Sequence, residues 1–173
     1  MNENFINLRD QEILYSIQEY LKSISIVSTL LEAGPDMPHN ILIAITTEQA
    51  SVNIMYVPLP EDHFEEIRLF QLFSLLVAEV SPENRNDLTV LLNELNSRSP
   101  LGSFSINEKG ELGFKYIFPV SRFGIPEEKA FLDIFSLYLN CLESFSRLVT
   151  DVNMGSVSLQ NALSGLISTD PEL

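Results

Sequence analysis

The chain has 173 residues, of which 45% are hydrophobic and 11 are phenylalanine, so it is long and apolar enough to bury a core. Its 10 Lys and Arg stand against 24 Asp and Glu, a formal net charge of −14, which disfavours nucleic acid and anionic membranes because phosphate binding needs clustered cations. It shows no apolar run of 18 residues and no basic-then-apolar leader, so we expect a cytoplasmic protein that does not span a membrane.

The first 60 residues predict one helix and three strands. Residues 9–24 form the helix, because large apolar side chains recur at a spacing of three and four: Leu14, Ile17, Leu21 and Ile24. Serines and β-branched residues then predict a strand around 26–33, ended by Gly34 and Pro35. The β-rich segments 41–48 and 51–59, separated by a short polar turn, predict a hairpin.

Residues 67–80 are ambiguous. Arg68, Gln71 and Ser74 lie three apart, as on one side of a helix. A continuous apolar run between turn signals also fits a strand that is buried on both faces. Periodicity alone does not decide between the two.

The next segment predicts a helix that begins at Ser81-Pro82-Glu83. A hydroxyl residue, a proline at the first helical position and an acid beside the positive helix end favour such a start. The leucines expected on its buried side are Leu88, Leu91, Leu92 and Leu95, and the segment "NSRSPLG" ends it.

A hairpin is predicted over residues 103–118. Apolar side chains alternate with small or polar ones in both arms, which places them on one face: Phe104, Ile106, Leu112, Phe114, Tyr116 and Phe118. Between the arms, Asn107 can bond to its own backbone and Gly110 can take a positive φ. Pro119 cannot donate to a ladder, so it predicts the end of the strand or an edge.

The longest predicted helix spans residues 126–151. Its apolar stripe follows a spacing of four and three, and we predict that it is the dimer or partner surface: Phe131, Phe135, Tyr138, Leu142, Phe145 and Val149. The helix is apolar over most of its circumference. It could pack between the sheet and residues 9–24 of its own chain, or also form a seam between two copies. A short helix follows at 156–167, capped by Ser156 or Ser158, and the tail is expected to be frayed.

Few residues carry reactive chemistry. His39 has no second ligand nearby, whereas His63 lies among Glu61, Asp62, Glu65 and Glu66, which leaves open an alternative in which this acidic loop holds a metal or small ligand. Cys141 lies among apolar residues of the long helix without an activating neighbour, and a lone cysteine agrees with a reducing compartment. We therefore predict no catalytic residue, no cofactor and no metal, and a protein that is not an enzyme.

The order of elements and the segment "LLNELNSRSPLGSFSINEKGELGFKYIFPV" together resemble the YbjN family, whose fold is similar to that of class I type III secretion chaperones. The resemblance covers roughly residues 10–150. It implies an α+β fold with an antiparallel sheet of about five to six strands flanked by helices. We expect a single domain over 1–155 and a short helix with a frayed tail over 156–173.

The resemblance also implies a function. Secretion chaperones are small acidic bacterial homodimers that bind an extended segment of another protein, and YbjN-like proteins are described loosely as regulators. The expected function is therefore a non-enzymatic protein-binding module, a chaperone-like or regulatory homodimer with an unknown protein partner. Two alternatives to this function stay open. The chain could be a metal- or small-ligand-binding protein or an enzyme that uses the loop around His63, or it could be a structural subunit of a larger assembly.

Overall fold

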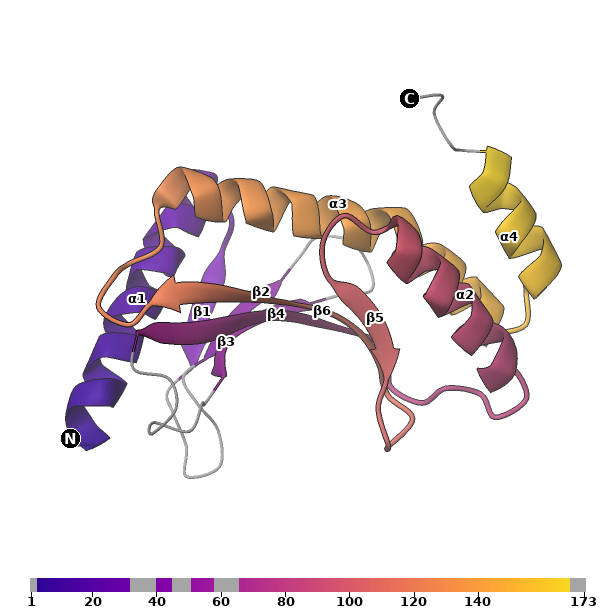
Figure 1. Cartoon of the computed structure of the whole chain (residues 1–173), viewed down its shortest axis with the longest axis horizontal. Coiled ribbons are helices and arrows are strands. Elements are labelled where there is room, and N and C mark those ends of the chain that lie inside the picture. Colours follow the sequence, from indigo (N-terminus) through magenta and orange to yellow (C-terminus); the bar gives the residue numbers. More distant parts are fainter. Residues whose placement is uncertain (1–2, 32–39, 45–50, 58–65, 169–173) are drawn as a thin grey trace. The chain divides into compact units, whose positions relative to one another are not determined.

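The structure is a computed structural model that describes residues 3–31, 40–44, 51–57 and 66–168. These residues form four helices and six strands. In chain order (Figure 1) they are α1 (Glu3–Ser23), β1 (Ser28–Leu31), β2 (Asn40–Ala44), β3 (Ser51–Val57), β4 (Ile67–Val77), α2 (Arg85–Arg98), β5 (Ser103–Ile106), β6 (Leu112–Ser121), α3 (Glu128–Asn153) and α4 (Leu159–Ser168). The strands form one sheet in the order β1-β2-β3-β4-β6-β5, and β1 to β4 pair antiparallel. The predicted α+β class is confirmed.

The chain divides into two compact units. Unit 1 contains Met1–Ser74 and Lys115–Leu137, and unit 2 contains Leu75–Phe114 and Tyr138–Leu173. The strands β4 and β6 and the helix α3 each pass from one unit into the other. The expected single domain over 1–155 stays a prediction.

The elements of the first 60 residues agree with the sequence pattern. The helix begins earlier than residue 9, and the first strand is shorter than 26–33. The strands β2 and β3 pair antiparallel as the expected hairpin, with Ile43 opposite Val52. The turn between them, the 32–39 loop and the C-terminal tail lie outside the described residues.

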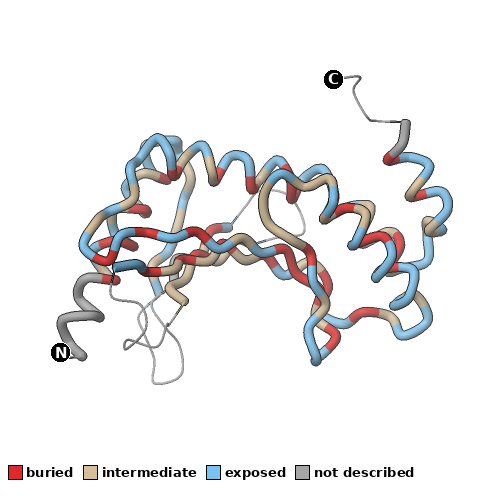
Figure 2. Tube along the Cα trace, viewed as in Figure 1, coloured by how far each residue is buried: buried red, intermediate tan, exposed pale blue. Residues whose placement is uncertain are grey.

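Segment 67–80 is a strand. Along β4 the buried residues Arg68, Phe70, Leu72 and Ser74 alternate with half-buried or exposed ones, which Figure 2 shows as a change of colour along the trace. The strand is therefore fully buried on one face only. The helix-like spacing of Arg68, Gln71 and Ser74 is coincidental, because Gln71 lies on the opposite face from the other two.

The predicted start of α2 is wrong by a few residues. Residues 82–84 form a turn, and the helix begins at Arg85 with Asn84 as its N-cap. Asn84 makes no side-chain cap, because its Nδ2 donates to the carbonyl of Asn153, 2.9 Å away, and the Ser81 amide donates to the Asn153 side chain. The turn thus anchors the end of α3. The four leucines of α2 are buried as expected.

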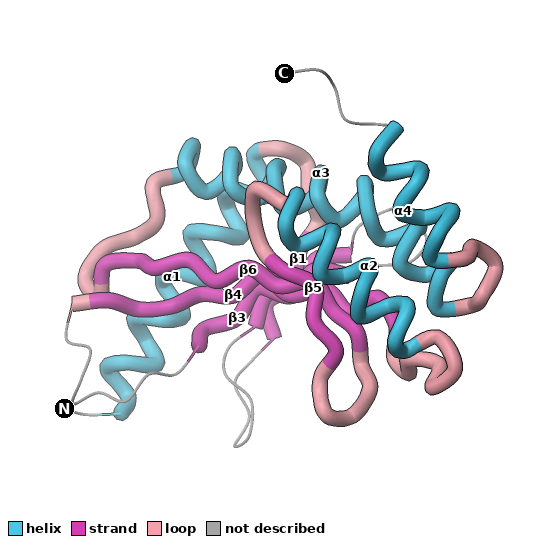
Figure 3. Tube along the Cα trace, turned by 45° about the vertical axis from the view of Figure 1, so that its right-hand side comes forward, coloured by secondary structure: helices cyan, strands magenta, loops and turns pink. Residues whose placement is uncertain are grey.

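The hairpin of β5 and β6 is confirmed, and Figure 3 shows its loop. The Asn107 side chain accepts from the amides of Lys109 and Glu111, and Gly110 has a φ of +83°. The strand continues past Pro119 to Ser121, so Pro119 does not end it. The strand β5 has only four residues and is shorter than β6. This agrees with the second interpretation of Pro119, namely that it lies at an edge position.

The last two helices begin at side-chain caps. The Glu127 carboxylate accepts from the amides of Lys129 and Ala130 at the start of α3. The Ser158 hydroxyl accepts from Asn161 at the start of α4, which selects Ser158 rather than Ser156 as the cap. The helices predicted at 126–151 and 156–167 are thus confirmed with small shifts of their bounds.

Candidate protein-binding face

The register of the sheet in unit 1 separates two sets of side chains. Ile54 stands opposite Leu72, and both side chains are completely buried. One position further along, Met55 stands opposite Gln71, and both are only half-buried. Because successive residues of a strand point to opposite faces, these two pairs mark a covered face and a second, less covered face.

Aromatic contacts show what lies on the covered face. Phe70 of β4 stacks on Phe118 of β6, and Phe118 meets Phe131 of α3. Phe131 also lies 6.3 Å from Tyr20 of α1, measured between ring centroids. The helices α1 and α3 therefore pack on the same face of the sheet in unit 1.

An ion pair joins α1 to the covered face. The Arg68 guanidinium on β4 pairs with the Asp10 carboxylate on α1, and their side chains are 6% and 5% exposed. Two charges this deeply buried are tolerated only when they neutralise each other. The pair therefore sets the position of α1 along β4.

The second face, which we call the open face, carries the polar Thr29, Asn53, Gln71 and Lys115 and a larger number of apolar side chains in unit 1: Leu31, Leu42, Met55, Val57, Ile67, Leu69, Phe73 and Ile117. Leu31, Ile67 and Ile117 are 39%, 38% and 40% exposed, and the other apolar side chains are half-buried. On this face, Gln71 Nε2 donates to Met55 Sδ at 3.7 Å. The described helices of unit 1 lie against the other side, so this face offers an apolar surface.

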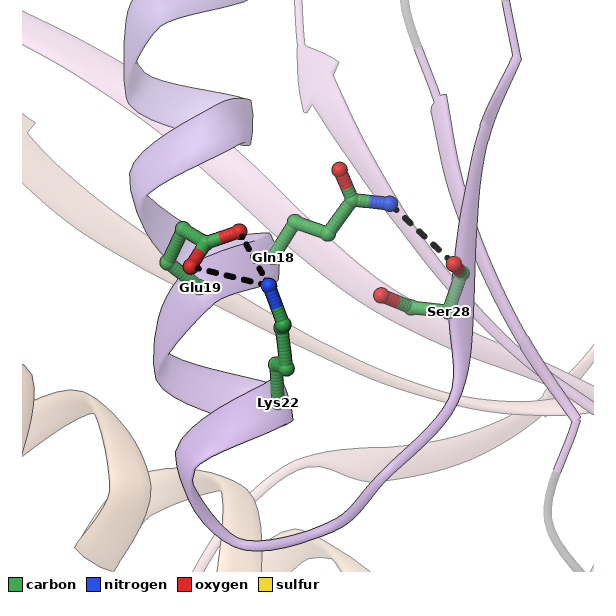
Figure 4. Close-up of polar contacts among 4 residues, drawn as sticks. All are labelled: Gln18, Glu19, Lys22 and Ser28. Atoms are coloured by element: carbon green, nitrogen blue, oxygen red, sulfur yellow. Dashed lines mark hydrogen bonds and ion pairs between the residues drawn. The ribbon is translucent and has the colours of Figure 1, made fainter.

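A hollow of about 390 Å³ lies at the end of α1, next to the edge strand β1. Figure 4 shows its polar contacts: Gln18 Nε2 donates to the carbonyl of Ser28, and Lys22 pairs with Glu19 at 3.4 Å. Val27, in its lining, is 81% exposed. Its charges already neutralise each other, so the hollow presents polar groups without a net charge of its own.

The six residues predicted as a dimer or partner surface lie mostly in the core of the chain. In unit 1, Phe131 and Phe135 are 2% and 0% exposed. In unit 2, Tyr138 is completely buried and donates from its hydroxyl to the Phe114 carbonyl, while Leu142 and Val149 are buried and Phe145 is half-buried against Phe104. This stripe serves intramolecular packing. Whether α3 also contributes to a seam between two copies stays a prediction.

Of the two histidines and the cysteine considered in the sequence, the structure describes Cys141. No group of three His, Cys, Asp or Glu side chains within the described residues could hold a metal ion. Cys141 is buried, whereas His39 and His63 lie outside the described residues, so the alternative that uses the His63 loop stays a prediction. None of the helices within the described ranges is long and apolar enough to cross a membrane.

No protein-family model and no curated protein matches the sequence. Solved structures that are similar to it include the following two. The crystal structure of YbjN from E. coli, a candidate transcription regulator, has 11% identity over 84% of this chain and 94% of its own, with a TM-score of 0.49. An uncharacterized protein from Methanothermobacter thermautotrophicus has 9% identity over 80% of this chain and 97% of its own, with a TM-score of 0.50.

The archaeal structure, at a TM-score of 0.50, has a similar fold. A YbjN structure is among the similar ones, as the resemblance seen in the sequence implies. At such low identity the likeness concerns the fold alone.

Sequence reasoning missed the buried ion pair and did not assign residues to the open face. A signal for the pair was present, because Arg68 stands inside an apolar strand, where an unpaired cation would be costly. The residues of the open face could not be assigned from the sequence because they are as apolar as those of the covered face. Only the strand register and the packing of helices on one side distinguish the two.

Proposed function

We propose that this protein is a non-enzymatic protein-binding module, a chaperone-like or regulatory homodimer that binds a segment of a partner protein on the open face of unit 1. The observation that carries the proposal is the one-sided cover of this part of the sheet. Helices α1 and α3 lie on one face, while the other exposes Leu31, Ile67 and Ile117. Contiguous exposed apolar surface is typical of interaction sites.

The chemistry of the partner follows from charge. The chain carries a formal net charge of −14, while the open face itself consists mainly of apolar side chains. An acidic partner would be repelled, and a neutral or basic one would be attracted during its approach. The expected occupant is therefore an amphipathic segment with an apolar side for the face and neutral or basic residues elsewhere.

The test places one charge on the open face. Ile117→Asp puts a carboxylate at an exposed position of β6, and Val90→Asp puts the same charge at a 51% exposed position of α2 in unit 2 as a control. Partners are captured on the wild-type chain in the host, identified by mass spectrometry, and the purified partner is titrated against all three proteins. We expect Ile117→Asp to weaken binding at least tenfold and Val90→Asp to leave it within twofold.

Two results would contradict the proposal. In one, Ile117→Asp folds as the wild type does by circular dichroism and binds the partner equally well. In the other, both variants weaken binding to the same extent, which would indicate an effect of total charge rather than of the open face. The homodimer is tested separately by light scattering across micromolar concentrations, where a monomer throughout would refute it.

A further inference from the structure

The outer edge of β5 in unit 2 is occupied by a side chain. Asn96 lies near the end of α2, and its Oδ1 accepts from the backbone N–H of Phe104 at 2.7 Å. Its Nδ2 donates to the carbonyl of the same residue at 3.0 Å. Both backbone groups of Phe104 are therefore bonded to one side-chain amide.

This arrangement reproduces a strand pairing. In an antiparallel ladder, a hydrogen-bonded pair of residues exchanges two N–H···O bonds, one in each direction. A carboxamide is chemically a peptide group, with one acceptor and a donor on neighbouring atoms. Asn96 thus takes the place that a residue of a neighbouring strand would take.

Two of the usual protections of an edge strand, charge and proline, are absent from β5. Its sequence, SFSI, contains no charge and no proline, and it ends the sheet next to β6. Strands of this kind pair readily with strands of other chains. The helix α2 does not close the edge by itself, because a hollow of about 330 Å³ remains between them, lined by Asn93, Asn96 and Ser105 among others.

We propose that Asn96 is a surrogate strand that prevents a second copy of this chain from pairing edge to edge along β5. A second copy is the relevant competitor because it presents the same uncharged strand and the same unpaired backbone groups once the amide is removed. At this end of the sheet the edge strand β5 is then closed to pairing. The binding site proposed on the open face of unit 1 does not use β5.

The experiment compares Asn96→Ala with Asn93→Ala, a matched control on the exposed side of α2 that lines the same hollow and has no bond to β5. Both are made in a Cys141→Ala background that carries Ser105→Cys on the exposed side of β5. Mass is measured by analytical ultracentrifugation over a hundredfold range of concentration, and a short bis-maleimide reports contact between the thiols introduced at position 105 of two copies.

We expect Asn96→Ala to associate at least tenfold more tightly than the parent and to cross-link through residue 105, while Asn93→Ala does neither. If Asn96→Ala does not fold, Asn96→Ser replaces it, since a hydroxyl on one carbon cannot reach both backbone groups. Association no tighter than that of the parent, or association without the cross-link, would overturn the proposal. So would rapid hydrogen exchange of the Phe104 amide in the wild-type chain.

Discussion

Two helices of this protein end in the same way but with different residues. After α1, the Ile26 amide donates to the Leu21 carbonyl and the Ser25 amide to the Lys22 carbonyl. After α3, Ser156 and Gly155 make the equivalent bonds to Asp151 and Val152. In both places the turning residue has a left-handed backbone, with a φ of 64° at Ser25 and 71° at Gly155. Glycine adopts this conformation without strain and serine does not.

We therefore expect opposite results from exchanging these residues. Ser25→Gly should stabilise unit 1 by roughly 0.5 kcal/mol, because relief of strain exceeds the added entropy of the unfolded chain. Gly155→Ala should cost about 1 kcal/mol, and its new Cβ would lie 3.4 Å from the side-chain Nδ2 of Asn84. Urea unfolding of the two variants checks the signs. A Ser25→Gly variant that is less stable than the wild type would contradict this account of the turn.

The buried pair of Asp10 and Arg68 has a larger expected effect. Asp10→Ala removes the carboxylate that pairs with this buried guanidinium, so we expect a loss of about 3–5 kcal/mol in the free energy of unfolding. The double variant Asp10→Leu/Arg68→Met removes both charges and should recover most of that loss. Chemical denaturation of the single and double variants measures the difference. Equal losses in both would show that the pairing of charges is not what matters at this position.

Because of Tyr20, we expect the free energy of unfolding to depend on pH in the alkaline range. Burial raises the pKa of its hydroxyl above the usual value, and the carboxylates of Glu128 and Glu127 raise it further. The group is neutral below its pKa, so its contribution is complete below about pH 10 and is lost as the pH rises through the higher value of the folded state. Wild type should therefore lose more stability than Tyr20→Phe as the pH rises above about 10 in urea titrations. Parallel losses in the two proteins would refute this.

At the scale of elements, α3 remains the candidate for a seam between two copies, but through its outer side. The stripe from Phe131 to Val149 packs within the chain, whereas Leu137 is 38% exposed. If the homodimer uses α3, Leu137→Asp should weaken dimerisation at least tenfold, while Val90→Asp, equally charged and on another helix, should not. Sedimentation over micromolar concentrations measures the dimerisation of both variants. Unchanged dimerisation of Leu137→Asp would move the seam elsewhere.

The pattern of residues predicted most elements because their signals are local. The Asn107 to Gly110 turn, the leucines of α2 and the apolar stripe of α3 all follow directly from the spacing of side chains. The start of α2 was misplaced because Asn84 bonds to Asn153, far along the chain, and no local pattern reports such a partner. The roles of Asn96 and Asp10 were missed for the same reason, since each depends on a residue from another element.

For the molecule as a whole, two surfaces have different tasks. In unit 1 the sheet has helices on one face and an apolar open face on the other. In unit 2 the edge strand β5 is sealed by Asn96. The net charge of −14 adds repulsion between copies and disfavours acidic partners. An acidic protein with one exposed apolar face and one sealed strand edge is suited to bind a segment of another chain without pairing along β5.

Site-specific photo-cross-linking in the host tests the central claim most directly. A photoreactive phenylalanine analogue replaces Ile117 on the open face in one strain and Val90 on α2 in another. We predict a cross-linked product with another protein from position 117 and none from position 90, and peptide mapping should place the link in an amphipathic segment of neutral or basic charge. A partner that cross-links at position 90 and not at position 117 would contradict the assignment of the open face as the binding surface.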